Sequence, residues 1–319
     1  MAVKLVMGFL ISLACVLVLM PAFIDFMKRI SFNQTVSEYA LDEYKEKAKT
    51  PIMGGVMFII VPVVISLAMT ENPLADLDLM IVLITYVGYG LIGFIDDFLI
   101  AVKHDNDGLL PRYKFLMQVV LALIVFLIYR SDATLDVTLL FTKKKIELGI
   151  FYILLILFMF SGASNAVNLT DGMDGLAAGC ELFALIPYLL FAIRQGKTSI
   201  AIFIGCMLGA LIGYLHFNLK PAKIFMGDTG SLALGAVLAA LAMVMKKELS
   251  LIIIGGVFVI ETLCVMIQIG SVKLRHKRVF PYTPIHYAFT VKGVPEEKVV
   301  RYFWVCAIIC AVIGGFIAL

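Results

Sequence analysis

Charged side chains are scarce in this chain of 319 residues: Asp, Glu, Lys and Arg make up 15% of it, against about a quarter in an average soluble domain. Paired cysteines are missing too. All six cysteines lie inside apolar segments, and none belongs to a CxxC motif or a Cys/His cluster. This pattern argues against a disulfide framework and a zinc site, so we expect the cysteines to be small core residues. The chain also lacks internal repeats and low-complexity segments.

Long apolar runs dominate instead, and 62% of the residues are hydrophobic. The runs have the length that a membrane span needs and do not alternate in polarity, so they predict helices. The first run lacks a clear signal-peptidase site and is longer than a signal-peptide core, so it is interpreted as a span. We expect an all-α polytopic membrane protein with about ten transmembrane helices, forming one integral membrane domain over residues 1–319. The predicted spans are 4–25, 52–70, 79–95, 114–130, 148–163, 177–193, 198–216, 230–245, 249–270 and 300–318.

The positive charges predict the orientation of these spans. Together with Arg301, one set of loops holds 17 of the 26 lysines and arginines. The positive-inside rule places this set in the cytoplasm and both termini outside. These loops are 28–50, 96–114, 164–176, 217–229 and 271–299.

Two adjacent carboxylates, Asp96 and Asp97, close the third predicted span in "GFIDDF". Neighbouring acids at a membrane boundary repel each other unless a cation or a proton shares the site. Mg²⁺ favours such oxygen ligands. A solvated helix end is the alternative interpretation.

The run "NAVNLTDGMDG" at 165–175 is polar between two apolar segments. We expect Asn168–Asp171 to start the sixth helix, with Asp171 and Asp174 on one face near its positive end. Helix capping explains one acid and one neighbour such as Asn168 or Thr170. It leaves the remaining polar residues unexplained, which favours a functional site.

A similar polar stretch, "FMGDTGS", begins the eighth predicted span with Asp228 and Thr229. Such a helix start binds anions through its free N–H groups, and an N-cap without further function is the alternative. In the longest basic loop, two prolines and three aromatic residues surround His286 in "PYTPIHYAF", which predicts a shaped surface. The intramembrane acids Glu181 and Glu261 are functional candidates. Glu261 could instead stabilise a break in its helix.

At these residues the sequence resembles the polyprenyl-phosphate N-acetylhexosamine-1-phosphate transferases. The resemblance covers nearly the whole chain and implies ten transmembrane helices in a bacterial plasma membrane, with the active site on the cytoplasmic face. Seven ordered blocks carry it: "TPIMGG" at 50–55, "GFIDDF" at 93–98, "RYKFLMQ" at 112–118, "NAVNLTDGMDGLAAG" at 165–179, "FMGDTGSLALG" at 225–235, "VFVIETLCVMIQ" at 257–268 and "TPIHYAFTVKG" at 283–293.

The resemblance implies that phospho-MurNAc-pentapeptide moves from its UDP carrier to undecaprenyl phosphate, giving lipid I and UMP, with Mg²⁺ as cofactor. The implied partners are UDP-MurNAc-pentapeptide, undecaprenyl phosphate and membrane lipid, with no nucleic acid; members of the family are commonly homodimers. Both substrates carry negative charge, so cations and in-line positioning should lower the barrier.

The resemblance also implies residue roles. Asp96 would act on the lipid phosphate, as base or as covalent nucleophile, while Asp97 and Asp228 would hold Mg²⁺. His286 would be the first histidine of the family's signature loop. The implied substrate contacts are Asn168, Asp171 and Asp174 at the nucleotide sugar, Phe225 stacked on uracil, and Lys114 at phosphate with Lys49 and Thr50 nearby.

The sequence departs from the family pattern at two places. The signature loop usually has three consecutive histidines, and here "HYA" keeps only His286. The second threonine of the usual "TPTMGG" is Ile52. A relative that uses UDP-GlcNAc is the second interpretation, although the loop lacks the His-Ile-His pattern typical of those enzymes. A secondary transporter is the third, disfavoured because the acids gather at one face and no repeat is visible.

Overall fold

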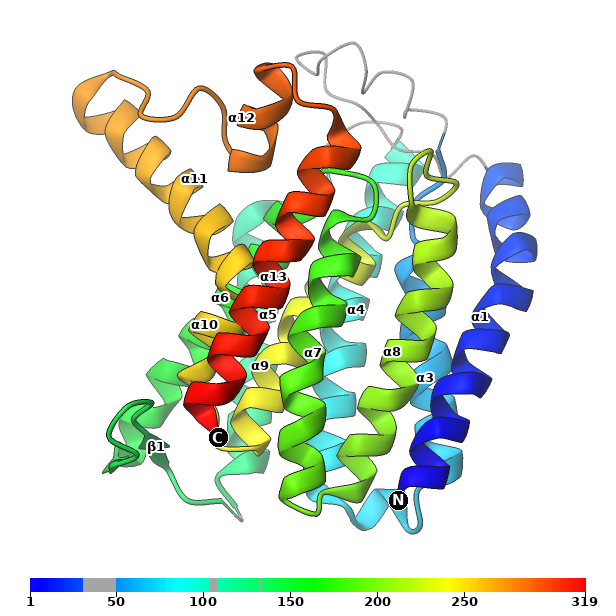
Figure 1. Cartoon of the computed structure of the whole chain (residues 1–319), viewed down its shortest axis with the longest axis vertical. Helices are drawn as coiled ribbons and strands as arrows, with labels where there is room; N and C mark the ends of the chain where they lie inside the picture. Colours follow the sequence, from blue (N-terminus) through cyan, green and yellow to red (C-terminus); the bar gives the residue numbers. More distant parts are fainter. Residues whose placement is uncertain (31–49, 104–107, 132) are drawn as a thin grey trace.

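A computed structural model describes residues 1–30, 50–103, 108–131 and 133–319, which form a helical bundle (Figure 1). Within this part of the chain, nine helices are long and apolar enough to cross a membrane. They are α1 (Ala2–Arg29), α4 (Leu77–Lys103), α5 (Pro111–Tyr129), α6 (Tyr152–Thr170), α7 (Leu176–Arg194), α8 (Thr198–Asn218), α9 (Gly227–Val244), α11 (Gly256–Arg275) and α13 (Glu296–Ala318). The apolar helix α3 (Gly55–Met69) is shorter, with 15 residues.

The remaining elements are short. A two-stranded antiparallel hairpin pairs β1 with β2, and Val137 lies opposite Ile146. These elements are η2 (Pro73–Ala75), β1 (Asp136–Thr138), β2 (Lys145–Glu147), η3 (Gly149–Phe151), α10 (Ser250–Ile254) and α12 (Ile285–Val291). Both termini lie at the end of the bundle opposite α12 (Figure 1). The prediction of an all-α polytopic membrane protein is confirmed, and the six cysteines form no disulfide.

Helix α9 is the centre of the bundle, because nearly all of its residues from Thr229 to Val244 are buried. A helix that is apolar all round belongs in such a position. Two glycines bring its neighbours close to it. A Cβ on Gly93 of α4 would lie 2.1 Å from the carbonyl oxygen of Asp228, and one on Gly235 would lie 2.2 Å from the carbonyl oxygen of Ala163 in α6. Helices α4 and α6 therefore pack directly against α9.

Two helices extend further than their apolar runs predict. Asp96 and Asp97 do not close a span, because α4 continues to Lys103 and both carboxylates are buried within it. The interpretation as a solvated helix end is therefore wrong. The apolar run stops earlier because this part of α4 faces polar groups of α9.

The sixth predicted helix does not begin at Asn168–Asp171. Asn168 and Thr170 lie in the last turn of α6, Asp171 is its C-terminal cap residue, and α7 begins after Gly175. Gly175 has φ +77°, a left-handed conformation that glycine adopts readily. Asp171 and Asp174 therefore lie on the connection between two helices and not on one helix face. The polar residues that resembled an N-cap instead contact neighbouring helices.

Candidate active site at the ends of α4, α5, α6 and α9

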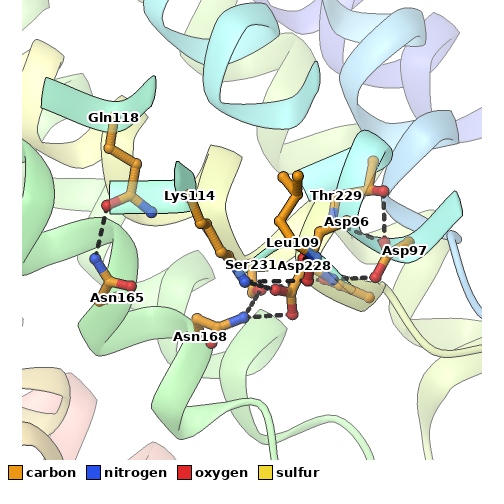
Figure 2. Close-up of polar contacts among 11 residues, drawn as sticks. Asp96, Asp97, Leu109, Lys114, Gln118, Asn165, Asn168, Asp228, Thr229 and Ser231 are labelled. Atoms are coloured by element: carbon orange, nitrogen blue, oxygen red, sulfur yellow. Dashed lines mark hydrogen bonds and ion pairs between the residues drawn. The ribbon is translucent and has the colours of Figure 1, made fainter. Parts of the chain in front are cut away.

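Lys114 joins two of the predicted acids (Figure 2). It lies in the first turn of α5, and its ammonium bonds Asp96 Oδ2 at 3.2 Å and also bonds Asp228 Oδ2. The second oxygen of Asp96 accepts the backbone N–H of Leu109 at 2.7 Å. The Lys114 and Asp96 side chains are 17% and 8% exposed, so solvent screens this charge cluster only weakly. Residues from three segments thus form one cation–carboxylate network.

Asp97 caps helix α9 from the neighbouring helix. Its Oδ1 accepts the N–H of Asp228 at 3.0 Å, and its Oδ2 accepts the N–H and the hydroxyl of Thr229 at 2.9 and 2.6 Å. The first N–H groups of a helix have no partner within the helix, so a carboxylate at this position is stabilising. The carboxylate oxygens of Asp228 itself accept from Asn168 and Lys114. Asp97 therefore fixes where Asp228 lies.

Asn168 completes the network from α6. Its Nδ2 donates to Asp228 Oδ1 at 2.7 Å and to Ser231 Oγ at 2.9 Å. Both oxygens of Asp228 are thus held, one by an amide and one by the Lys114 ammonium. In addition to Asp97, four predicted site residues meet here: Asp96, Lys114, Asn168 and Asp228.

Asp174 holds the connection between α6 and α7 in place. Its Oδ2 accepts the N–H of Ala222 at 3.0 Å, and its own N–H donates to Glu296 Oε1 at 2.9 Å. Glu296 also pairs with Lys220 at 3.1 Å. Sequence reasoning did not select Glu296, which follows the last motif block by three residues. Asp171 is partly exposed beside this anchor.

His286 is buried beneath the same connection. Its Nδ1 lies 3.0 Å from Glu261 Oε1, and the carboxylate of Glu261 also accepts the N–H groups of Ile285 and His286 at 2.8 and 3.2 Å. A Cβ on Gly172 would lie 2.3 Å from His286 Nε2, and Tyr287 donates to the carbonyl oxygen of Gly172 at 3.0 Å. Helix α12 is therefore fastened between α11 and the 171–175 connection.

This contact answers the question that the sequence left open about Glu261. The helix break lies at Gly255, between α10 and α11, whereas Glu261 bonds the start of α12. Glu261 therefore positions the His286 segment and does not stabilise the break. Tyr287 stands where the family usually has its second histidine, and its hydroxyl makes the hydrogen bond to Gly172 described above.

Phe225 belongs to a small cluster with the segment that precedes α3. Gly54 donates its N–H to Phe225 O at 2.8 Å, and Phe225 donates to Pro51 O at 2.9 Å. Its ring packs against the cluster that contains Ile52, which is 6% exposed. The threonine-to-isoleucine departure thus extends an apolar contact. Thr50 lies at the start of this segment, and Lys49 lies outside the described residues.

A cavity of about 250 Å³ opens beside the network. Asp96 and Lys114 line it, together with Gln118 and Asn165. Sequence reasoning missed these last two residues as site candidates. Both lie in motif blocks, but only their position on the packed helices brings them to the cavity.

The oxygen ligands of the network suit Mg²⁺. Within the described residues, no three His, Cys, Asp or Glu side chains gather closely enough to hold a metal alone. Mg²⁺ is usually held by one or two carboxylates with water and substrate phosphate, and the Lys114 ammonium already marks a cation position between Asp96 and Asp228. The residues present therefore fit an ion that shares its ligands with a phosphate.

Known proteins resemble this chain over most of its length. The model of glycosyl transferase family 4 matches residues 79–246, more than half of the chain. The chain is 42% identical over 317 residues to a phospho-N-acetylmuramoyl-pentapeptide-transferase of Staphylococcus saprophyticus, covering 97% of each protein. It is also 42% identical over 315 residues to the enzyme of that name from a Geobacillus species, covering 98% of this chain and 97% of the relative.

Proposed function

The chain belongs to glycosyl transferase family 4. We infer that it is a phospho-N-acetylmuramoyl-pentapeptide transferase, the activity for which its relatives are named. It transfers phospho-MurNAc-pentapeptide from UDP to undecaprenyl phosphate, giving lipid I and UMP for peptidoglycan synthesis. The observation that carries this proposal is Lys114 held between Asp96 and Asp228 beside a cavity within a membrane-spanning bundle.

The reaction joins two anions. An oxygen of the lipid phosphate attacks the phosphorus that carries the sugar, and the bond from this phosphorus to the bridging oxygen of UMP breaks. UMP leaves with the electron pair. Lys114 lowers the repulsion between the two phosphates, and in-line positioning supplies much of the remaining acceleration.

Asp96 is proposed to act on the lipid phosphate. It lines the cavity and bonds Lys114, so it is close to where an anion would bind. As a base it removes the proton from a phosphate oxygen before attack. As a nucleophile its carboxylate oxygen attacks the phosphorus that carries the sugar and UMP leaves; an oxygen of the lipid phosphate then attacks the same phosphorus and releases the carboxylate. Trapping of a phosphosugar on the protein in the absence of lipid phosphate supports the second route, and its absence supports the first.

Asp228 and Asp97 are proposed as Mg²⁺ ligands. When bound, the ion neutralises phosphate charge and stabilises the leaving UMP. Asn168 and Lys114 orient the carboxylate of Asp228. Asp97 would bind the ion through lone pairs that its three hydrogen bonds leave unused.

The nucleotide sugar is proposed to bind near the 171–175 connection. Asp171, Asp174 and Asn168 would line this side, Phe225 would stack on uracil, and Thr50 with Lys49 would lie close to phosphate. His286 would contact the donor through its second ring nitrogen, which makes no hydrogen bond to any described residue. Glu261 keeps that nitrogen directed away from α11.

We propose that the chain is one integral domain in the bacterial plasma membrane, with the site on the cytoplasmic face and both termini outside. The distribution of positive charge supports this orientation. Reporter fusions at the two termini test it, and a cytoplasmic signal from either fusion overturns it. Homodimer formation is a further expectation from the family, to be measured by the mass of the detergent-solubilised protein.

The decisive assay follows UMP release in detergent from UDP-MurNAc-pentapeptide, with undecaprenyl phosphate and Mg²⁺. We expect UMP only when both substrates and the ion are present, and loss after chelation that added Mg²⁺ restores. No release under these conditions overturns the proposal. A preference for UDP-GlcNAc in a donor competition overturns the muramyl assignment alone.

A further inference from the structure

We propose that Gln118, oriented by Asn165, donates a hydrogen bond to the phosphate of the lipid acceptor. This inference rests on the proposed function and adds a substrate contact to it. Gln118 is 1% exposed, and its Nε2 is buried without a hydrogen-bond partner among the described residues. A buried donor that finds no partner is costly, so this nitrogen is a position where a ligand oxygen gains stabilisation.

The orientation of the two amides follows from their neighbours. Asn165 Nδ2 lies 2.7 Å from the backbone oxygen of Ser161, which only accepts hydrogen bonds, so this atom must be the donating nitrogen. The same Nδ2 lies 2.8 Å from Gln118 Oε1. Because that oxygen accepts, the other end of the Gln118 amide is its NH₂ group. Figure 2 shows the Gln118 oxygen turned toward Asn165 and the nitrogen on the side of Lys114.

The position of Gln118 on its helix connects it to the phosphate chemistry. Gln118 follows Lys114 by four residues on α5 and therefore shares its face, about 6 Å further along the axis. Both side chains line the cavity that also contains Asp96. A phosphate that contacts the Lys114 ammonium thus has a second donor in the Gln118 amide.

The cavity suits the acceptor better than the nucleotide. Leu109 and Phe115 contribute apolar surface to it, and Phe115 is 55% exposed on a membrane-spanning helix. A ligand with an anionic head and a hydrocarbon tail matches a lining that combines the Lys114 ammonium with apolar side chains, one of them exposed on a membrane-spanning helix. Uridine would leave its polar groups against these apolar side chains, which is unfavourable.

Two substitutions test the donor and its orientation separately. Gln118→Met keeps a similar side-chain length and removes the NH₂ group. Asn165→Asp places an acceptor-only carboxylate beside Gln118, so the amide of Gln118 turns its NH₂ toward that carboxylate and its oxygen toward the cavity. Gln195→Met is the matched control, because Gln195 is exposed and donates to Met245 O at 3.0 Å far from the cavity.

The kinetic measurement separates the acceptor from the donor substrate. We expect Gln118→Met and Asn165→Asp to raise KM for undecaprenyl phosphate about tenfold or more, the usual effect of losing a hydrogen bond to a charged group. KM for the UDP-linked donor and the melting temperature should change little, and the control should match wild type. A purely structural role would lower the melting temperature instead. Unchanged acceptor KM in both variants, or a rise confined to the donor KM, overturns the inference.

A binding measurement needs no turnover and keeps the two proposals distinguishable. Farnesyl phosphate and farnesol share a tail and differ in the phosphate, so the difference in thermal stabilisation that they give reports the phosphate contact. Wild type should prefer the phosphate, and Asn165→Asp or Gln118→Met should lose most of that preference. An undiminished preference in the variants overturns the role of Gln118, whatever the wild-type enzyme does with UDP-linked donors.

Discussion

Substitution of Gly93 by alanine should slow the enzyme strongly without replacing any charged residue. The added Cβ would lie 2.1 Å from Asp228 O and 2.5 Å from the N–H nitrogen of Thr229. Ordinary contacts with a Cβ begin at 3.4 Å, so α4 and α9 must move apart by about 1 Å. A displacement of about 1 Å in an active site lowers the rate about hundredfold, and overpacking costs about 1–3 kcal/mol of stability. We expect turnover to fall about hundredfold while the protein still inserts into the membrane.

The assay is UMP release from purified protein, with the melting temperature measured on the same sample. Gly162→Ala in α6 is the matched control, because a Cβ there meets nothing within 4 Å and alanine favours the helix. The control should retain full activity. Wild-type turnover in Gly93→Ala would refute the close-approach reasoning, and equal damage in the control would show a general sensitivity of helix glycines instead.

Three further predictions concern single side chains. Asp228→Ala should abolish UMP release while the detergent-solubilised protein keeps its size-exclusion profile, and full activity would remove Asp228 from the site. Glu261→Gln should weaken the contact between Glu261 and the start of α12 by about 1–3 kcal/mol. A lower melting temperature and a lower kcat would show this, and unchanged values would contradict the role of Glu261. The hydrogen bond from Thr134 and the nearby lysines, chiefly Lys246, hold the pKa of Asp136 below its usual range. The stabilisation is therefore present above about pH 4 and lost as pH falls through the lowered pKa. Thermal melts of wild type should converge with those of Asp136→Asn at acid pH, and a constant difference would contradict this.

The apolar runs predicted the helices well because the length and composition of a run are local properties. Nine described helices and the shorter α3 lie where the spans were expected. The boundaries failed where a helix continues into polar surroundings. Asp97 and Asn168 interrupt their apolar runs but remain helical, because α9 supplies their partners. Hydropathy alone does not distinguish such buried polar residues from a helix end.

The members of the candidate network could be selected from sequence, but their contacts could not. Carboxylates in motif blocks pointed to Asp96 and Asp228, whereas the role of Asp97 depends on the N–H groups that α9 presents to it. The same holds for glycine: Gly93 and Gly162 are both helical, and only packing tells that one contacts α9 and the other nothing. Gln118 became a candidate only because its neighbours fix the orientation of its amide.

The cap that Asp97 provides for α9 also has a consequence for biosynthesis. The carboxylate and its first donor are 131 residues apart in the chain, so α4 is synthesised well before α9 leaves the ribosome. Until then Asp97 lacks these donors, and a buried ionised carboxylate without partners is unfavourable. Arrival of α9 supplies the donors and brings Asp228 to Lys114 in the same step. A nascent chain therefore gains the cap of α9 and the network around Asp228 together, and a chain that ends before residue 227 lacks both.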